Sequence, residues 1–524
     1  MSGGSERPTD GRDPLLGGIL STDQYQLTMA QMYWKEGLAD LPAQFDYFFR
    51  GYPDYGTHQA GYCITAGLGW LLDWMEGARF GEPELDALRN QTTPQGSRRF
   101  DEGFIRWLAE NGTFGSIAVD AVPEGRVVHA NIPVATVTGP LAMAQILETP
   151  FLNRLNYPTL IATKASRVKE AARDRPVLEF GMRRGPASGA DAGGRAALIG
   201  GCDSTSNVAL SHAVDLDPKG THAHSLVQVY LALGMGELEA FRRFAAAYPE
   251  ECVLLVDTVD VLTSGVPNAI AIFEELVAGG HKPAGIRIDS GDLAYLAIQS
   301  AILLDDAGFG KVPIVLSSDL DELVIWQILY QIETEAPRYD ILASSLIDRL
   351  MFGVGTRLIT SHGDPALGGV YKLVAVGDGQ GGWAPAIKVS EDVEKIPIPG
   401  DKTVYRLYDD RGLATADVVA LADEEIPTTG LLELFHPHRD AHRILDTSDL
   451  SEVEELMRTV FENGKRRDRG EGIGELRRRR VADLARLDTG VRRLVNPHIY
   501  HVSLTPGMKT LQRDLVAKAL GEGV

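Results

Sequence analysis

The chain has 524 residues, enough for two or three domains, because one hydrophobic core seldom grows beyond about 250 to 300 residues. Hydrophobic residues make up 44% and charged residues 23%, which is typical of a soluble globular protein. The net charge of -21 argues against a general surface for nucleic acid or anionic membranes, so any phosphate site must be a local cluster of cations.

The cysteines and the N-terminus favour a cytoplasmic protein. Cys63, Cys202 and Cys252 are widely spaced and form no CxxC pair, so neither a zinc motif nor a redox motif is indicated. Residues 1–19 begin with a polar stretch rich in Gly and Pro, which predicts a flexible lead-in rather than a signal peptide. No uninterrupted apolar run reaches the ~18 residues of a membrane span, so no transmembrane helix is predicted.

A mixed α/β domain is predicted for residues 20–140. Helical patterns occupy 25–34, 68–75, 82–88 and 100–110, and strand patterns occupy 44–49, 117–122 and 126–137. A long helical pattern follows at 141–172, with breaks expected near Pro150 and Pro158 because proline removes a backbone donor.

A parallel α/β unit is predicted for residues 141–374. Apolar strands that run into polar or glycine-rich loops are expected at 177–180, 252–256, 285–288, 314–316 and 351–352. Strands that alternate with helices form parallel sheets, which bind ligands at the carboxyl ends of their strands. The residues expected at this rim are Arg183, Asp257, Arg287, Asp289, Ser318 and Thr356.

A smaller unit is predicted for residues 375–524. Strands are expected at 387–389, 404–407 and 418–420, a connecting stretch at 427–437, and helices at 451–462 and 474–487. The four arginines at 477–480 could mark a nucleic-acid surface. Their acidic neighbours Glu475 and Asp483, on an acidic chain, favour a solvated helix face instead.

Residues 220–225 read Gly-Thr-His-Ala-His-Ser and precede a helical pattern at 226–233. A histidine can carry a proton or, as a nucleophile, a phosphoryl group, although a turn with helix-capping histidines is the simpler interpretation of these six residues alone. Residues 353–356, Gly-Val-Gly-Thr, offer free N–H groups and a hydroxyl suited to a phosphate. An ordinary strand-to-helix turn explains this short motif equally well.

Arg287 and Asp289 lie two residues apart on a predicted strand, so their side chains should point to the same side. A cation beside a carboxylate suits a sugar phosphate, although Asp289 and Asp292 could instead bind a metal or cap a helix. The sequence contains no HExxH, GxSxG or P-loop motif. From the residues alone, we predict a barrel-like enzyme that acts on a phosphorylated sugar.

Several motifs, in chain order between about residues 20 and 400, resemble nicotinate phosphoribosyltransferases. They are TDQYQLT at 22–28, EFGMRR at 179–184, GGCDSTSN at 200–207, GTHAHS at 220–225, RIDSGDL at 287–293 and LGGVYKL at 367–373. The resemblance implies an irregular parallel α/β barrel at 141–374. It also implies a second mixed α/β domain built from N-terminal and C-terminal segments, with 375–524 packed on 20–140, and a homodimer.

The resemblance also implies a reaction. Nicotinate and 5-phosphoribosyl 1-pyrophosphate would give nicotinate mononucleotide and pyrophosphate in NAD salvage, with Mg²⁺ and coupled ATP hydrolysis, as in the ATP-dependent ligase class. Three alternatives stay open: a nicotinamide phosphoribosyltransferase, a non-catalytic regulator that binds sugar phosphates, and a structural or interaction protein.

The motifs assign roles to individual residues through this resemblance. His224 corresponds to the phosphorylated histidine, His222 to a variable position, and Ser225 to a position that is most often acidic. The resemblance implies nicotinate contacts for Tyr25, Thr221 and Arg287, with Arg183 as a further anion ligand. It implies ribose contacts for Asp257 and Asp289. It implies phosphate contacts for Gly355 and Thr356. No metal ligand is assigned.

Overall fold

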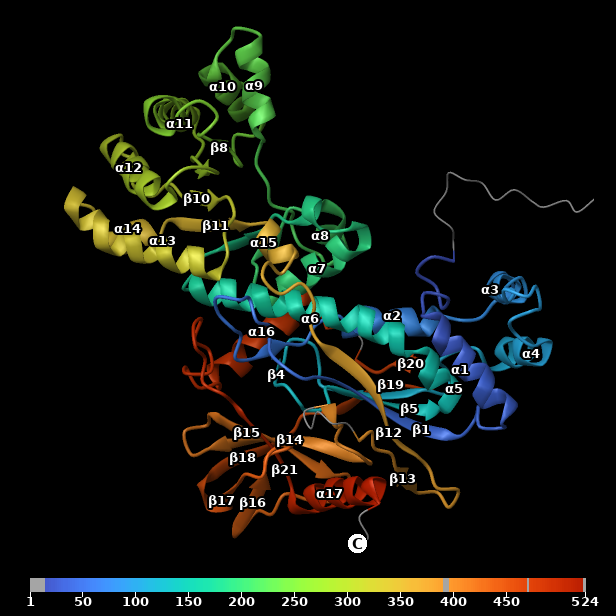
Figure 1. The fold of residues 1–524 in the computed structure, drawn as a ribbon. Coiled ribbons are helices and arrows are strands. Elements are labelled where there is room, and N and C mark those ends of the chain that lie inside the picture. Colours follow the sequence, from blue (N-terminus) through green and yellow to red (C-terminus); the bar gives the residue numbers. More distant parts are fainter. Residues whose placement is uncertain (1–14, 390–394, 469–470, 522–524) are drawn as a thin grey trace, which may run out of the picture.

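The computed structural model describes residues 15–389, 395–468 and 471–521. Its upper part holds a parallel sheet with flanking helices, and its lower part holds two further large sheets (Figure 1). A two-stranded sheet pairs β2 (Cys63–Ile64) with β4 (Val127–Val128). The long helix α6 (Glu148–Ala171) runs between the two parts.

The parallel sheet has the strand order β7-β6-β11-β10-β9-β8. Its strands are β6 (Val177–Glu179), β7 (Ser204–Thr205), β8 (Val253–Leu255), β9 (Gly285–Ile288), β10 (Ile314–Ser317) and β11 (Leu350–Val354). Helices α11 (Val266–Ala278), α12 (Leu293–Asp306) and α13 (Glu322–Glu335) follow β8, β9 and β10. The predicted irregular parallel α/β barrel is confirmed as a curled sheet with β7 and β8 at its edges.

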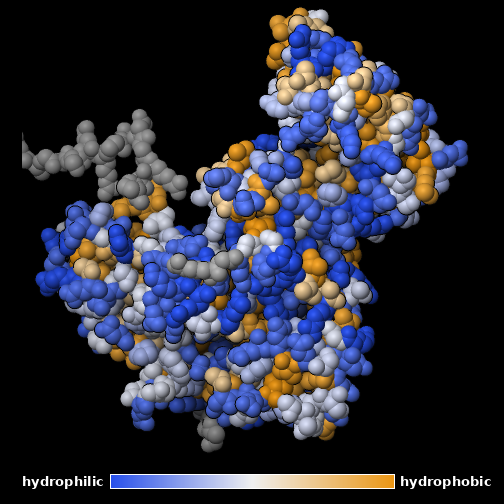
Figure 2. Space-filling model, turned by 180° about the vertical axis from the view of Figure 1, so that it is seen from behind, coloured by the Kyte–Doolittle hydropathy of each residue, from blue (hydrophilic) through white to orange (hydrophobic). Residues whose placement is uncertain are grey.

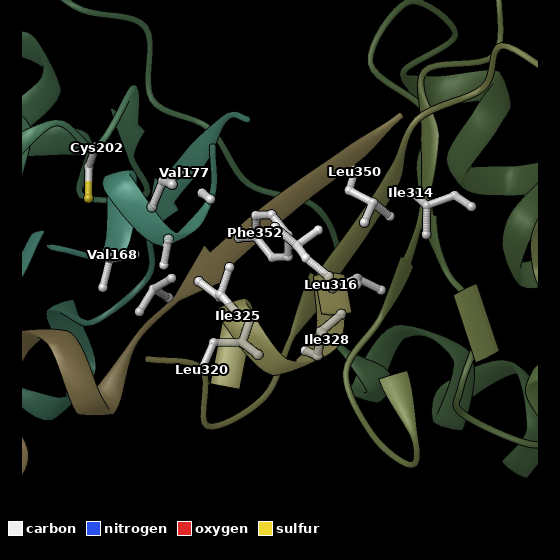
Figure 3. Close-up of a cluster of buried hydrophobic side chains, with 14 of the residues drawn as sticks. Val168, Val177, Cys202, Ile314, Leu316, Leu320, Ile325, Ile328, Leu350 and Phe352 are labelled. Carbon is white, nitrogen blue, oxygen red and sulfur yellow. The ribbon is translucent and has the colours of Figure 1, made fainter. Parts of the chain in front are cut away.

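The outer face of this sheet packs against its helices through a continuous apolar cluster. Leu316 of β10 and Phe352 of β11 lie near Ile328 and Ile325 of α13, and Ile314 of β10 belongs to the same cluster (Figure 3). These strands read as apolar runs in the sequence because both of their faces are covered.

Between β7 and β8 the chain forms α8 (Val208–Ala213), α9 (His224–Ala232) and α10 (Glu237–Ala247). Helices α9 and α10 project at the top of the molecule (Figure 1). The helix predicted at 226–233 is therefore confirmed as α9, which starts at His224.

Strands from both ends of the chain share one lower sheet, with the order β13-β12-β1-β5-β3-β19-β20. Its members are β1 (Pro42–Phe49), β3 (Ala118–Ala121), β5 (Ala135–Pro140), β12 (Gly369–Gly377), β13 (Trp383–Pro385), β19 (Arg458–Glu462) and β20 (Lys465–Arg466). Nearby helices are α1 (Gln24–Lys35), α2 (Leu68–Gly77), α3 (Glu82–Arg89) and α4 (Glu102–Asn111), which confirm the helices predicted there.

The other lower sheet has the order β17-β16-β21-β15-β14-β18. It contains β14 (Lys402–Asp409), β15 (Ala414–Leu421), β16 (Leu431–Phe435), β17 (His442–Asp446), β18 (Leu450–Glu455) and β21 (His501–Leu504). Helices α16 (Ile473–Ala485) and α17 (Pro506–Leu520) complete the C-terminal part.

Three predictions for this part were wrong. The helix expected at 451–462 consists of β18 and β19, because β18 pairs with β14 while Val460 and Phe461 of β19 are buried. The strand expected at 387–389 is irregular backbone, and β13 lies just before it. The connecting stretch expected at 427–437 contains β16, which pairs with β17.

Two further boundaries differ from the predictions. The strand expected at 126–137 is divided into β4 (Val127–Val128) and β5. The long helix breaks at Leu147, between α5 (Leu141–Ile146) and α6, near Pro150 as predicted, but the break expected near Pro158 is absent. Pro150 lies in the first turn of α6, where no intrahelical donor is required. Pro158 stays inside α6, and Gly67, with a φ of 98°, packs against its ring.

The described residues contain one helical stretch, 261–278, that is long and apolar enough to cross a membrane by length and composition. Its residues Val266, Ala269, Ile272 and Phe273 are buried in the core beside the parallel sheet. This is the position of a core helix.

Candidate active site

A cavity of about 400 Å³ opens at the carboxyl ends of the parallel strands. Its lining includes five residues that were singled out from the sequence: Arg183, Thr221, His224, Arg287 and Asp289. The remaining lining residues are Phe180, Ser206, Gly220, His222, Ala223 and Leu255. Side chains from three separate strand-to-helix connections thus meet in one place.

His224 is the first residue of α9, and its side chain is 39% exposed. The ring nitrogen Nδ1 lies 3.0 Å from the hydroxyl oxygen of Thr258, and Nε2 lies 3.8 Å from Oδ1 of Asp257. Asp257 is nearly inaccessible to solvent, and its Oδ1 has no hydrogen-bond partner among the described residues. The imidazole therefore has a hydroxyl on one nitrogen and a buried carboxylate facing the other.

Asp257 also joins the loop after β8 to the loop after β9. Its Oδ2 accepts hydrogen bonds from the backbone N–H of Asp289, at 3.1 Å, and from the hydroxyl of Ser290, at 2.6 Å. This carboxylate consequently fixes the position of Asp289 relative to His224.

Arg287 and Asp289 are linked through Ser317, the last residue of β10. The Nε of Arg287 donates to the Ser317 hydroxyl oxygen at 2.9 Å, and that hydroxyl donates to Oδ1 of Asp289 at 2.6 Å. Arg287 also pairs directly with Asp289 at 3.2 Å, and its guanidinium lies 5.4 Å from the centre of the Phe180 ring. The predicted adjacency of Arg287 and Asp289 is confirmed.

Glu179 holds the loop that carries Phe180 and Arg183. This buried carboxylate accepts hydrogen bonds from the N–H of Gly181 and from the hydroxyl of Thr205 on β7. Burial raises the pKa of Glu179 above its usual value, while those two donors and the charge of Arg183 act in the opposite direction. Arg183 itself is exposed and lines the cavity.

The predicted phosphate loop follows β11, and Thr356 starts the short helix α15 (Thr356–Ile359). Gly355 lies so close to the carbonyl of Phe180 that a Cβ on it would be 3.2 Å from that oxygen. Gly355 and Thr356 are therefore beside the Phe180 loop, although they do not line the cavity itself.

Asp292 and Tyr25 lie outside the cavity. The side chain of Asp292 accepts a hydrogen bond from the backbone N–H of Tyr295 and caps α12. Helix capping is one of the roles that the sequence left open for this residue. Tyr25, on α1, is half exposed and lines a different cavity of about 370 Å³ together with Asn153, Tyr157 and Leu367. One chain alone does not bring Tyr25 to His224.

Sequence reasoning missed the contributions of Ser317, Phe180 and Thr258. The predicted strand at 314–316 ended one residue before Ser317, and Phe180 was assigned only as a strand residue. A usable signal was present, because each of these residues stands at or just beyond the carboxyl end of a predicted parallel strand.

A magnesium ion needs few protein ligands when substrate phosphates supply the others. Among the described residues, no group of three or more His, Cys, Asp or Glu side chains could hold a metal alone. The unpartnered Oδ1 of Asp257 and the carboxylate of Asp289 nevertheless provide oxygen donors beside the cavity. These residues fit an ion that is bound mainly through a phosphorylated substrate.

Comparisons with known proteins agree with the motifs. Residues 20–156 match the nicotinate phosphoribosyltransferase (NAPRTase) N-terminal domain, and residues 401–512 match the nicotinate phosphoribosyltransferase C-terminal domain. The nicotinate phosphoribosyltransferase of Bacillus subtilis (strain 168) is 37% identical over 489 residues, covering 93% of this chain and 92% of that protein. The human nicotinate phosphoribosyltransferase is 32% identical over 553 residues, covering 95% of this chain and 96% of that protein.

A solved structure shares the fold as well. The crystal structure of human nicotinic acid phosphoribosyltransferase matches with a TM-score of 0.76 and 28% sequence identity, over 94% of this chain and 99% of that one. The similarity therefore extends over both the parallel sheet and the lower sheets.

Proposed function

Because the chain belongs to the nicotinate phosphoribosyltransferase family, we propose that it joins nicotinate to the phosphoribosyl group of 5-phosphoribosyl 1-pyrophosphate, in NAD salvage. The pyridine nitrogen forms the new bond to the anomeric carbon, and pyrophosphate leaves with the electrons of the broken C–O bond. The observation that carries this proposal is the single cavity that joins Arg287, Asp289 and His224.

Arg287 and Phe180 are suited to hold the nicotinate ring. A guanidinium binds a carboxylate more strongly than a neutral amide, so Arg287 favours nicotinate over nicotinamide. Arg183 on the same wall adds a second cation for an anionic substrate. Phe180 offers an aromatic face beside Arg287, on which a pyridine ring can stack.

Asp289 is suited to the ribose. Departure of pyrophosphate builds positive charge on the sugar ring, and a fixed carboxylate nearby stabilises that charge and accepts hydrogen bonds from the ribose hydroxyls. Mg²⁺, held by Asp257 and Asp289 together with substrate phosphates, would neutralise the charge of the departing pyrophosphate. Gly355 and Thr356, beside the Phe180 loop, are the proposed contacts for the 5-phosphate.

His224 is the proposed acceptor of a phosphoryl group from ATP. Asp257 faces Nε2 and would keep a proton there, so the unprotonated Nδ1 accepts a hydrogen bond from the Thr258 hydroxyl. The hydroxyl turns away as the Nδ1 lone pair attacks the γ-phosphorus. The bond from the γ-phosphorus to its bridging oxygen breaks, ADP leaves, and Asp257 balances the positive charge of the phosphorylated ring. The added phosphate brings about two negative charges to the cavity, and water later removes it as inorganic phosphate.

We also propose a homodimer in which Tyr25 serves the site of the partner subunit. Tyr25 is exposed, and Val229 and Leu231 of α9 and the next residue after the helix, Leu233, are exposed to solvent in the single chain. Apolar side chains are visible on the projecting upper lobe in Figure 2. Contiguous exposed apolar patches are typical of protein contact surfaces, which supports the proposed dimer.

A cytoplasmic location completes the proposal. Cys63, Cys202 and Cys252 are all buried and unpaired, as expected in a reducing compartment.

The test measures pyrophosphate release from nicotinate and 5-phosphoribosyl 1-pyrophosphate, with and without ATP. The unmodified chain should release pyrophosphate faster with ATP, and His224→Ala should lose that enhancement while it keeps some ATP-independent release. His212→Ala, at an exposed histidine of α8, is the matched control and should behave like the unmodified chain. Absence of release under both conditions, or equal turnover of nicotinamide, would refute the proposed function.

A further inference from the structure

The segment of residues 216–223, here called the strap, spans the gap between the two edge strands of the parallel sheet. At one edge, the backbone N–H of Lys219 donates to the carbonyl of Thr205 on β7 at 2.9 Å. At the other edge, the backbone N–H of Leu255 on β8 donates to Nε2 of His222 at 3.2 Å. An imidazole therefore takes the place that a strand carbonyl would occupy.

The hydrogen bonds of His222 define one protonation state. Since Nε2 accepts from Leu255, the ring proton must reside on Nδ1, which lies 3.3 Å from the carbonyl oxygen of Ala223. The ring is buried, and its centre lies 4.9 Å from that of Phe244 and 6.0 Å from that of Phe241, both on α10. A neutral ring bonded at both nitrogens has little freedom to turn.

Burial and a charged neighbour favour the same neutral state. Burial lowers the pKa of His222, and the positive charge of Arg287 lowers it further, while the hydrogen bond to Ala223 acts in the opposite direction. A proton on Nε2 would oppose the N–H of Leu255 and break the link to β8.

This link sets the geometry on both sides of His224. On the strap side, His222 bonds to Ala223, the residue that precedes α9 and His224. On the strand side, Leu255 precedes Asp257 by two residues and Thr258 by three, and these two residues face the His224 ring. A shift of the strap along β8 would therefore separate His224 from both of its neighbours.

We propose that His222 is a positioning residue that ties the strap to β8 and so holds His224 against Thr258 and Asp257. The proposal rests on the proposed function of His224 as the phosphoryl acceptor. It assigns a role to a position that the family motif leaves variable, and it excludes His222 itself as a nucleophile, because both of its nitrogens are engaged inside the protein.

Two variants separate positioning from general stability. His222→Leu fills a similar space but leaves the Leu255 N–H without an acceptor, whereas the side-chain oxygen of His222→Gln can replace Nε2. We expect His222→Leu to lower the ATP-dependent enhancement of pyrophosphate release on the order of tenfold, the effect of one lost buried hydrogen bond, and His222→Gln to restore most of it. His212→Leu, on α8, is the matched control for the substitution itself.

Hydrogen–deuterium exchange at the Leu255 amide provides a readout that does not depend on activity. Exchange should be slow in the unmodified chain and in His222→Gln, and faster in His222→Leu. Unchanged exchange in His222→Leu, or equal loss of the ATP enhancement in both variants, would overturn the proposal. If the unmodified chain releases no pyrophosphate at all, the proposed function fails, and Leu255 exchange still decides whether the link exists.

Discussion

Ser317 illustrates how a small side chain controls a charged pair. Its hydroxyl accepts from Arg287 and donates to Asp289, so the carboxylate and the guanidinium are held in fixed orientations through one oxygen. Ser317 is buried, and water therefore cannot easily take over these bonds.

We expect Ser317→Ala to weaken nicotinate binding. Without the hydroxyl, Nε of Arg287 loses its acceptor, and the guanidinium can turn toward Asp289 and away from substrate. The loss of such a bond to charged groups costs about 1.5–3 kcal/mol, which corresponds to a decrease in kcat/KM for nicotinate of roughly 10- to 100-fold.

Steady-state kinetics with nicotinate as the varied substrate would test this effect. Ser345→Ala, at an exposed serine of α14 (Ala343–Ile347), is the control and should leave kcat/KM unchanged. A Ser317→Ala variant with the kinetics of the control would show that Arg287 is oriented by other contacts.

At the scale of elements, two of the arginines at 477–480 join α16 to the end of α7 (Ala187–Gly200). Nε of Arg477 donates to the carbonyl of Leu198 at 2.8 Å, and Arg480 donates to the carbonyl of Gly200. The carbonyls at a helix C-terminus lack intrahelical donors and carry partial negative charge, so these guanidinium groups cap α7. The sequence predicted that all four arginines lie on a solvated helix face. Only Arg478 does so, with a side chain that is 73% exposed, whereas the other three are partly or fully buried.

We therefore expect Arg480→Met to destabilise the protein. Methionine retains most of the buried length but removes the donors, which should cost about 2 kcal/mol and lower the melting temperature. Arg480 lies against Gly201, whose φ of 121° ends α7, so the loss should be concentrated at this junction.

Thermal unfolding of Arg480→Met beside Arg478→Met would measure this difference. The second variant removes an arginine from the same helix, but from a surface pair with Glu475, and should change the melting temperature little. Equal shifts for the two variants would contradict the capping role.

The failures and successes of the sequence predictions have a common physical cause. The parallel strands and the rim at Arg287 and Asp289 were predictable because a strand buried on both faces forms a local apolar run with a polar loop at its end. The role of Arg480 was not predictable, because its partner Gly200 is 280 residues away in sequence. Residues 451–462 were misassigned as a helix because the pairing of β18 with β14 and of β19 with β3 outweighed their local helical pattern.

At the scale of the whole molecule, the active cavity and Tyr25 are parts of different regions. The cavity belongs to the parallel sheet, whereas Tyr25 lies on α1 beside the sheet that combines both ends of the chain (Figure 1). In the proposed twofold homodimer, each subunit would offer α1 to the cavity of the other and so bring these regions together.

Mixing equal amounts of two variants that each lack the ATP-dependent release tests this arrangement directly. Tyr25→Ala keeps His224, and His224→Ala keeps Tyr25, so a heterodimer with sites shared between subunits contains one intact site and one doubly altered site. After the two variants are unfolded and refolded together, random pairing should restore roughly a quarter of the ATP-dependent pyrophosphate release of the unmodified chain, because half of the dimers are mixed and each has one working site of two. Each variant refolded alone controls for residual activity. No recovery in a mixture shown to contain heterodimers would mean that Tyr25 serves its own subunit or does not contact substrate.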